Sequence, residues 1–465
     1  MKQPSVRDGQ LKEHAAQARQ IAVQIVYEVF EKGAYANVAL ERTLRSSSLA
    51  GMNRSLVTEI VNGSIRMVRH LDWVLDLFLA KPISKQQPWV RNILRVSLYQ
   101  LIFMDRIPAY ACVNDAVSMA VSIAGQRLGS VVNGVLRNYL RRQGEVQIPA
   151  DDMLQHLAIK YSYPDWLVQE FVELGDVILA EEMLGYMNQP PALVARNNLM
   201  RISRDDLVKR LQGEGVDSEA GLYTPWSVRF KGLKQALTEL TSYKEGLFYL
   251  QNEGSMLAAA ILDPPLQGMV YDLGAGVGGK STHLAEIMGN QGQIVAVELH
   301  AHKLRLLEEN CRRLGIGNVL PLQSDLLQLA AECRPAERVL LDAPCSGWGV
   351  LNRRSDARWR QSRQEIAALP QLQYEMLQAA AELVKPGGLL LYSTCTINRR
   401  ENEQVVTRFL DQAPFSMQGF ADKIGFFPLA AADYEQAARG WLSLLPGRYD
   451  CDGMFYALLR RQAVI

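Results

Sequence analysis

Two cysteines stand in turn-like sequences, each directly after an expected strand. Cys345 lies in Asp-Ala-Pro-Cys-Ser-Gly at 342–347, and Cys395 lies in Ser-Thr-Cys-Thr at 393–396. A single cysteine after a strand is usually a buried residue that only packs in the core. Two of them, in Pro-, Gly-, Ser- and Thr-rich turns that share one edge of a sheet, instead predict a reactive and partly exposed thiol.

A thiolate at this edge could add to carbon C6 of a cytosine. C5 of cytosine is a poor nucleophile toward a sulfonium methyl group, and addition at C6 converts the ring to an enamine with electron density on C5. The adduct must then lose the C5 proton and expel the thiol. A carboxyl group near N3 or the exocyclic amine would stabilise charge on the ring, and Asp342 is placed for that role.

A glycine-rich turn between an expected strand and an expected helix predicts a cofactor site. Glycines there allow a tight turn and a close approach of a ligand to the main chain. Such a loop can also be an ordinary turn, and NAD, FAD, nucleotides and S-adenosylmethionine all use similar loops. The predicted cofactor contacts in this loop are Gly274, Ala275, Gly276, Val277, Gly278, Gly279 and Lys280.

Charged residues at the ends of neighbouring strands sharpen the cofactor prediction. Glu298 ends the second strand and could accept hydrogen bonds from both ribose hydroxyls. Lys280 could meet an amino-acid carboxylate, and Asp325, after the third strand, could accept from an adenine amino group. We also place Asp342 among the cofactor contacts. Each residue alone is more often a surface charge, but together they favour an adenosine-containing cofactor.

The elements that must position these residues alternate between strands and helices. Strands are expected at 269–271, 293–297, 318–322, 338–341 and 389–392, with a helix over 365–384 whose continuous part begins near Pro370. This alternation predicts a mostly parallel sheet with helices on both faces, a Rossmann-like α/β domain over 251–465.

The rest of the chain predicts two further domains. Residues 17–142 show helical spacing of apolar residues and no convincing strand, so 1–142 is expected to be an all-α domain. Residues 143–250 read as a helical linker followed by a small α+β RNA-binding subdomain.

Charge is unevenly distributed although the net charge is +1. Residues 1–142 carry 19 Lys and Arg against 10 Asp and Glu, and the remainder carries 31 against 39. A basic amino-terminal third suggests a phosphate-binding surface, the alternative being a solvated helical face.

A second basic cluster follows the Pro-Cys turn and surrounds Trp359. An aromatic residue among arginines suits phosphate contacts and base stacking, the alternative being a solvated helix start. A cytosine within folded RNA must also leave its stack to reach the cysteines. The predicted RNA contacts are Arg353, Arg354, Arg358 and Arg360.

These motifs, with Lys-Pro-Gly-Gly at 385–388 and Glu-Asn-Glu at 401–403, resemble the RNA cytosine-C5 methyltransferases of the Sun/Fmu type. The resemblance implies a class I methyltransferase fold and S-adenosyl-L-methionine as cofactor. It also implies that Cys395 is the nucleophile and that Cys345 assists release of the product.

The helical amino-terminal domain resembles the RNA-binding antitermination factor NusB. The resemblance rests on Asn53-Arg54, Val61-Asn62-Gly63 and the segment 131–137. A NusB-like domain joined to this catalytic domain implies a cytosine of 16S rRNA as target, free or in a partly assembled small subunit. Two alternatives stay open: a tRNA cytosine-C5 methyltransferase and a non-catalytic NusB-like RNA-binding factor.

Three segments depart from the family pattern. The cofactor loop usually reads Cys-Ala-Ala-Pro-Gly-Gly-Lys, whereas Gly274, Gly276 and Val277 stand here for the Cys, the second Ala and the Pro. Glu298 replaces the usual Asp, which lengthens the arm toward the ribose. Upstream, Leu-Arg-Val-Asn appears as Val-Ala-Arg-Asn at 194–197, which moves the arginine by one position.

Bulk properties favour a cytoplasmic protein without a metal. No apolar stretch approaches the ~20 residues that span a bilayer, and residues 1–14 lack the apolar core of a signal peptide. Six cysteines without a Cys-x-x-Cys pair favour free thiols over a disulfide scaffold or a structural zinc.

Overall fold

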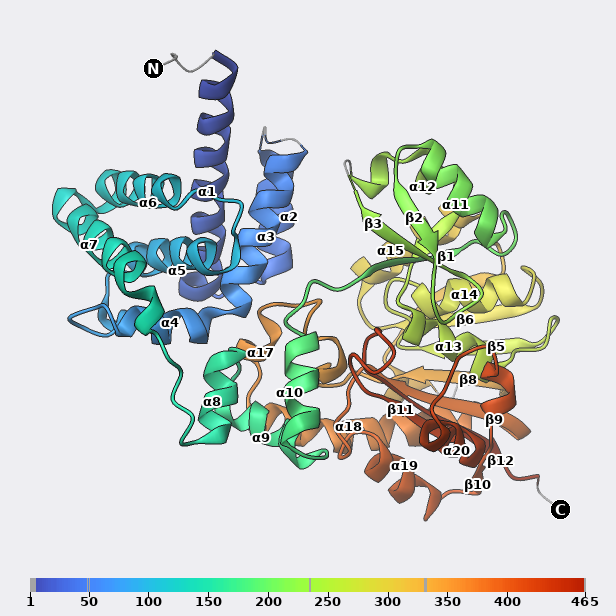
Figure 1. The fold of residues 1–465 in the computed structure, drawn as a ribbon. Coiled ribbons are helices and arrows are strands. Elements are labelled where there is room, and N and C mark those ends of the chain that lie inside the picture. Colours follow the sequence, from blue (N-terminus) through green and yellow to red (C-terminus); the bar gives the residue numbers. More distant parts are fainter. Residues whose placement is uncertain (1–5, 48, 50, 234–235, 330–332, 464–465) are drawn as a thin grey trace. The chain divides into compact units, whose positions relative to one another are not determined.

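The computed structural model describes residues 6–47, 49, 51–233, 236–329 and 333–463 (Figure 1). The chain forms two compact units, each discontinuous in sequence. The first comprises 1–189 and 351–360, and the second comprises 190–350 and 361–465. Part of the segment in which we expected no signal peptide, residues 1–5, lies outside the described residues.

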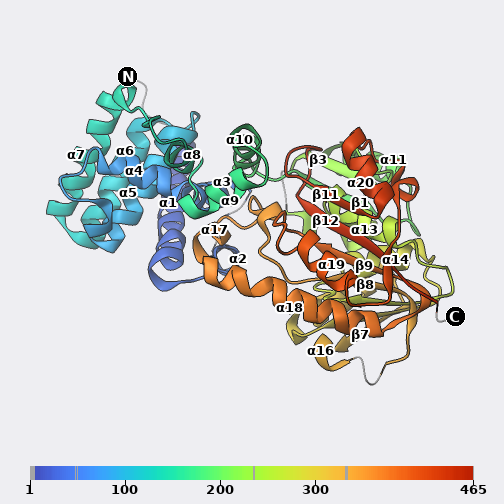
Figure 2. The ribbon, with the colours of Figure 1, turned by 90° about the horizontal axis from the view of Figure 1, so that it is seen from below.

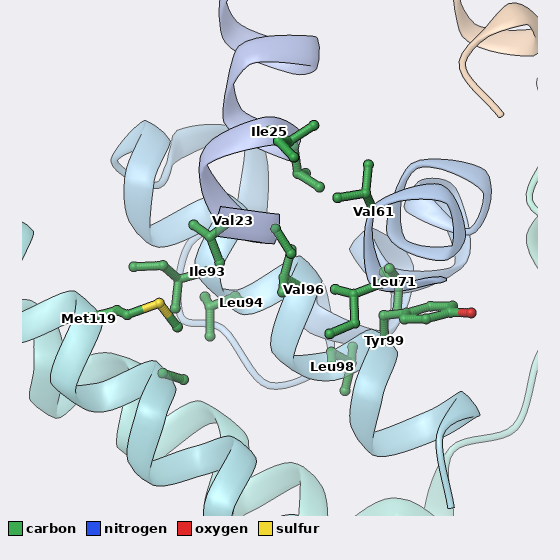
Figure 3. Close-up of a cluster of buried hydrophobic side chains, with 14 of the residues drawn as sticks. Val23, Ile25, Val61, Leu71, Ile93, Leu94, Val96, Leu98, Tyr99 and Met119 are labelled. Atoms are coloured by element: carbon green, nitrogen blue, oxygen red, sulfur yellow. The ribbon is translucent and has the colours of Figure 1, made fainter. Parts of the chain in front are cut away.

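The first unit is helical, as the apolar periodicity predicts. Its core gathers buried aliphatic side chains, among them Val23, Ile93 and Leu98, which belong to one cluster (Figure 3). Its main helices are α1 (Val6–Lys32), α2 (Ala36–Ser46), α3 (Met52–Arg66), α4 (Val68–Asp76), α5 (Pro88–Phe103), α6 (Ala109–Ala124), α7 (Gln126–Arg142), α8 (Met153–Lys160), α9 (Asp165–Glu173) and α10 (Val177–Tyr186).

A short excursion of the chain, 351–360, completes this unit. It includes helix α17 (Ala357–Arg360) and enters the unit directly after the Pro-Cys turn. The Trp359 indole donates to the Ile65 carbonyl at 2.8 Å, and the Asp356 carboxylate accepts from the Ala36 amide at 3.1 Å. These contacts make the excursion an integral part of the helical unit.

The second unit begins with a small four-stranded antiparallel sheet, in the order β2-β3-β1-β4. Its elements are β1 (Leu193–Asn197), α11 (Arg204–Gly213), β2 (Asp217–Ala220), β3 (Ser227–Gly232), α12 (Thr241–Lys244) and β4 (Phe248–Leu250). The mixture of short strand and helix patterns over 192–249 predicts this α+β subdomain correctly.

The large sheet has the order β10-β12-β9-β8-β5-β6-β7, with β11 paired to β12. The strands from β7 to β9 run parallel, and β12 runs antiparallel to β9. Its strands are β5 (Met269–Leu273), β6 (Gln293–Glu298), β7 (Val319–Gln323), β8 (Ala336–Asp342), β9 (Val384–Thr394), β10 (Phe415–Met417), β11 (Trp441–Leu444) and β12 (Met454–Arg461).

Helices cover both faces of this sheet (Figure 2). One buried core joins the sheet to α13, α14 and α15, and another joins it to α16, α18 and α19. The helices are α13 (Glu253–Leu262), α14 (Gly279–Ile287), α15 (Ala301–Leu314), α16 (Leu326–Leu329), α18 (Arg363–Glu382), α19 (Glu403–Leu410) and α20 (Ala431–Arg439). The predicted fold class, a multi-domain chain with a Rossmann-like α/β carboxyl-terminal domain, is confirmed.

One detail differs from the sequence prediction. Helix α18 begins at Arg363, seven residues before Pro370, because Ser362 and Glu365 form a capping box that satisfies its first amides. Within 143–250, helices α8–α10 belong to the first unit and the small sheet belongs to the second.

Candidate active site

The candidate site lies at the carboxyl ends of the parallel strands. The chain proceeds from β5 outward to β6 and β7, then returns to form β8 on the other side of β5. Ligands of open α/β sheets bind at such a reversal of strand order. The glycine-rich loop after β5 and the cysteine turns after β8 and β9 therefore share one rim.

The two cysteines meet at this rim. The Cys345 Sγ lies 3.4 Å from the Cys395 Sγ, and both residues are half-buried. Strands β8 and β9 pair in parallel with Asp342 opposite Ser393, so the turns that follow them start level with each other. The Gly349 amide also donates to the Cys395 carbonyl at 3.0 Å. The expectation that both turns reach one place agrees with this geometry.

The two thiols are not equivalent. The hydrogen bond with the Cys395 sulfur and burial of the thiol raise the pKa of Cys345 well above its usual range. The Cys345 thiol lies within reach to donate a hydrogen bond to the Cys395 sulfur.

Asp342 forms an ion pair with Lys280 rather than standing alone. The Lys280 Nζ lies 2.6 Å from the Asp342 Oδ2, and the Ser393 Oγ lies 3.3 Å from the Asp342 Oδ1. Burial opposes the charge of Lys280, but the adjacent Asp342 carboxylate outweighs it and raises the pKa of the ammonium. A buried cation thus fixes the carboxylate beside the cysteines.

The glycine-rich loop is bound to the end of β6. The Gly274 and Ala275 amides both donate to the Val297 carbonyl, at 3.0 and 2.9 Å. Gly274 has a φ of +81°, and a Cβ there would lie 2.4 Å from the Asp342 carbonyl oxygen. Only glycine allows the loop to approach the Asp342 turn so closely.

Glu298 holds the middle of the same loop. Its Oε2 accepts from the Gly276 amide at 3.1 Å, while its Oε1 accepts from the His300 amide at 3.0 Å and lies 3.3 Å from the Lys303 Nζ. Glu298, which is longer than the Asp usual in the family, thus reaches Gly276, which stands for the usual Ala. Asp325 is half-buried, and its Oδ1 accepts from the Leu327 amide at 3.0 Å.

Asp272, the second-last residue of β5, has no role in the sequence prediction. It is fully buried, its Oδ2 accepts from the Ser281 hydroxyl, and its Oδ1 has no hydrogen-bond partner. Burial raises the pKa of Asp272 to about 6. An acidic residue directly before a glycine-rich turn is the signal that could have identified it.

A buried network behind the cysteines fixes their turns. The Glu401 carboxylate accepts from the Ser346 amide and from the Gln373 amide group, both at 2.9 Å. The Asn402 side chain donates to the Thr396 carbonyl at 2.9 Å. Residues 401–403 enter the sequence prediction only through the family resemblance, and no local motif marks Gln373.

Arg196 connects the small sheet to the cofactor loop. Its side chain is fully buried and donates to both Glu286 oxygens, at 3.0 and 2.8 Å. Its Nη1 also donates to the Gly279 carbonyl at 3.1 Å. The arginine that stands one position away from the family pattern therefore supports the start of α14.

The predicted RNA-contacting arginines divide into two groups. Arg353 and Arg354 are exposed. Arg358 is fully buried, with its guanidinium 3.7 Å from the centre of the Tyr163 ring and 2.8 Å from the Asn188 Oδ1. Arg360 is half-buried and donates to Asp356 at 2.6 Å. In this arrangement Arg358 has no surface that a phosphate could contact.

Sequence comparison places this geometry among known methyltransferases. The family model described as 16S rRNA methyltransferase RsmB/F matches 259–460, the NusB family model matches 16–141, and a ferredoxin-like domain model of RsmF/B-like methyltransferases matches 163–235. A probable ribosomal RNA small subunit methyltransferase B of Synechocystis sp. is 36% identical over 96% of this chain and 99% of its own. The chain belongs to this methyltransferase family. The predicted resemblance to NusB-linked Sun/Fmu-type enzymes is thereby confirmed.

Further relatives and solved structures match this chain over most of its length. A probable ribosomal RNA small subunit methyltransferase B of Bacillus subtilis is 34% identical over 99% of this chain and 100% of its own. The crystal structure of PH0851 superposes with a TM-score of 0.78 at 27% identity, covering 96% of this chain and 99% of its own. The crystal structure of NSun6 from Pyrococcus horikoshii with SFG has a TM-score of 0.58 at 23% identity, which shows the fold. It covers 65% of this chain and 99% of its own.

Proposed function

We propose that this methyltransferase transfers a methyl group from S-adenosyl-L-methionine to C5 of a cytosine in 16S rRNA, through a covalent bond between Cys395 and the base. The observation that carries the proposal is the 3.4 Å approach of the Cys345 and Cys395 sulfurs beside Asp342 at the ligand-binding rim. Two thiols and a carboxylate are the groups that covalent activation of a pyrimidine requires.

The loop after β5 fits an adenosine-containing cofactor. Gly276 has a φ of +58°, and a Cβ there would meet no atom within 4 Å, so a ligand has room against the backbone. We assign Gly274, Ala275, Gly276, Val277, Gly278, Gly279 and Lys280 to the loop contacts, Glu298 to the ribose and Asp325 to the adenine. When bound, S-adenosyl-L-methionine supplies an electrophilic methyl group on a sulfonium ion.

The first step is addition of the Cys395 thiolate to C6 of the cytosine. A carbon–sulfur bond forms while the C5–C6 double bond opens, and electron density moves to C5 and the ring nitrogens. The Asp342 carboxylate accepts from the exocyclic amine and holds the base in place. The Lys280 ammonium, 2.6 Å away, holds that carboxylate in position.

The last step breaks the same carbon–sulfur bond. After C5 has gained its methyl group, the C5 proton leaves to a base, the C5–C6 double bond re-forms, and the Cys395 sulfur departs with its electron pair. The Cys345 thiol, 3.4 Å away, donates a hydrogen bond to that departing sulfur. We therefore assign to Cys345 the role of assisting product release.

The 16S rRNA target is supported by the names of the full-length relatives and by the NusB-like domain. A ribosomal RNA target also supports the expected cytoplasmic location. We propose Arg353 and Arg354 as RNA contacts because they are exposed. Arg360, which is half-buried against Asp356, is the weaker candidate, and Arg358 is proposed as a packing residue instead.

One experiment tests the target and the reaction together. The protein is incubated with methyl-tritiated cofactor and either 16S rRNA or a tRNA pool, and the labelled RNA is digested for mass analysis of nucleosides. The proposal expects label in 16S rRNA as 5-methylcytidine. Label in tRNA alone would show that the target is tRNA instead of 16S rRNA. Absence of label from every RNA would leave only the alternative of a non-catalytic RNA-binding factor.

A further inference from the structure

The two active-site thiols are also close enough to bond to each other. Their sulfurs are 3.4 Å apart, and a disulfide requires about 2.0 Å, so closure needs only small side-chain rotations. The backbone around them is already tied together, because the Gly349 amide donates to the Cys395 carbonyl at 3.0 Å. The next residues along, Ser346 and Thr396, place their hydroxyl oxygens 2.7 Å apart.

No other cysteine offers this arrangement. All six cysteines lie in the described residues and are free, and Cys112, Cys311 and Cys451 are buried. Cys333 is half-buried like the active-site pair, and it provides a single thiol for comparison. Across the described ranges, no three His, Cys, Asp or Glu residues gather as a possible metal-ligand cluster.

We propose that Cys345 and Cys395 form a modification site at which a hydroperoxide generates a reversible disulfide that turns the enzyme off. The Cys395 thiolate attacks the peroxide oxygen, the O–O bond breaks, and a sulfenic acid forms with release of water after protonation. The Cys345 sulfur then attacks the Cys395 sulfur, the S–O bond breaks, and a second water leaves. Overall two thiols are oxidised and one hydrogen peroxide is reduced to two waters.

The geometry gives Cys345 the part of the resolving thiol. A sulfenic acid with no neighbouring thiol oxidises further to sulfinic acid, which ordinary thiols do not reduce. A second sulfur at 3.4 Å diverts it to a disulfide that a small thiol such as dithiothreitol reopens. Since formation of this bond needs only the two thiols, the inference does not depend on the RNA target or on the methyl-transfer mechanism.

The test measures the bond itself rather than activity. The full-length protein, free of RNA and cofactor, is treated with hydrogen peroxide, alkylated, and digested without reduction for mass mapping. We expect one cross-linked peptide pair containing Cys345 and Cys395, two alkylatable thiols fewer per chain, and recovery of both with dithiothreitol. Cys333→Ser is the matched control and should give the same cross-link.

A second variant separates a true pair from two independently oxidised thiols. Cys345→Ser should convert Cys395 to sulfinic acid, with no recovery under dithiothreitol, at peroxide concentrations from which the wild type recovers fully. Free thiols at both positions after peroxide, or sulfinic acid at Cys395 in the wild type, would overturn the proposal. Loss of RNA methylation in untreated protein would count against the proposed function instead and leave the cross-link result unaffected.

Discussion

The Lys280 ammonium lies 2.6 Å from the Asp342 carboxylate, and this pair joins the start of α14 to the end of β8. The two residues come from the glycine-rich loop and from the Pro-Cys turn. The ion pair therefore connects the residue that we propose faces the cofactor with the residue that we propose faces the base.

Asp342→Asn should destabilise the second unit as well as impair catalysis. The side chain of Lys280 is only 11% exposed, so loss of Asp342 leaves a nearly buried cation without its partner, at a cost of roughly 3 kcal/mol. The pKa of Lys280 is raised, so this stabilisation is complete below its unfolded pKa near 10.5 and is lost only as the pH rises through the higher folded value. Urea unfolding at neutral pH measures the loss. The double variant Lys280→Met/Asp342→Asn should recover most of the stability but not the activity.

Cys395→Ala should lower turnover by roughly 10³-fold or more, because the proposed carbon–sulfur bond forms with the sulfur that this substitution removes. Cys345→Ala should instead accumulate a protein–RNA adduct that survives denaturing gel electrophoresis, since the departing sulfur loses its hydrogen-bond donor. Accumulation of the adduct in Cys395→Ala would show that the two roles are exchanged.

Asp272→Asn should change how stability depends on pH. Because the pKa of Asp272 is raised to about 6 in the folded chain, ionising it costs the fold about 3 kcal/mol once the pH exceeds that value, and nothing below the unfolded pKa near 3.8. The variant should therefore gain stability relative to the wild type as the pH rises from 4 to 7. Thermal melts of both proteins across that range measure the difference in stability. The same pH dependence of the melting temperature in both proteins would contradict the raised pKa of Asp272.

Glu298→Asp should weaken cofactor binding by roughly tenfold, the equivalent of one hydrogen bond. The shorter side chain cannot keep both the Gly276 amide and the ribose within reach. Titration calorimetry with S-adenosylhomocysteine gives the affinity, and Lys303→Met serves as a control that retains the Gly276 contact. An unchanged affinity would show that Glu298 does not contribute to cofactor binding.

Substitution of the basic cluster should distinguish phosphate contacts from packing. Arg353→Ala/Arg354→Ala should reduce the salt slope of RNA binding by about 1 for each lost phosphate contact and leave stability unchanged. Arg358→Ala should lower the free energy of unfolding by roughly 3 kcal/mol, because the Ser162, Met187 and Asn188 oxygens lose their donor. Binding measured between low and moderate salt would test the first expectation, and urea unfolding the second.

The fold could be predicted from local patterns, whereas the site's contacts could not. Apolar periodicity and turn residues define the strands from β5 to β9, and parallel pairing then brings Cys345 and Cys395 to one rim. The Lys280–Asp342 and Arg196–Glu286 pairs join residues far apart in sequence, so no spacing rule predicts them. Burial of Arg358 was missed because a basic segment beside a Pro-Cys turn has the same composition whether it faces RNA or a tyrosine ring. The boundaries 1–142, 143–250 and 251–465 stay predictions.

Residues 351–360 also constrain the order in which a nascent chain can fold. The helical unit contains Arg358 and Trp359, which the ribosome adds more than 150 residues after Gln189, the last residue of the unit's first segment. During translation that first segment lacks the contacts of Tyr163 and Ile65 with residues 351–360 until β5–β8 have been synthesised. Completion of the helical unit is thus a late event in synthesis, although its sequence comes first.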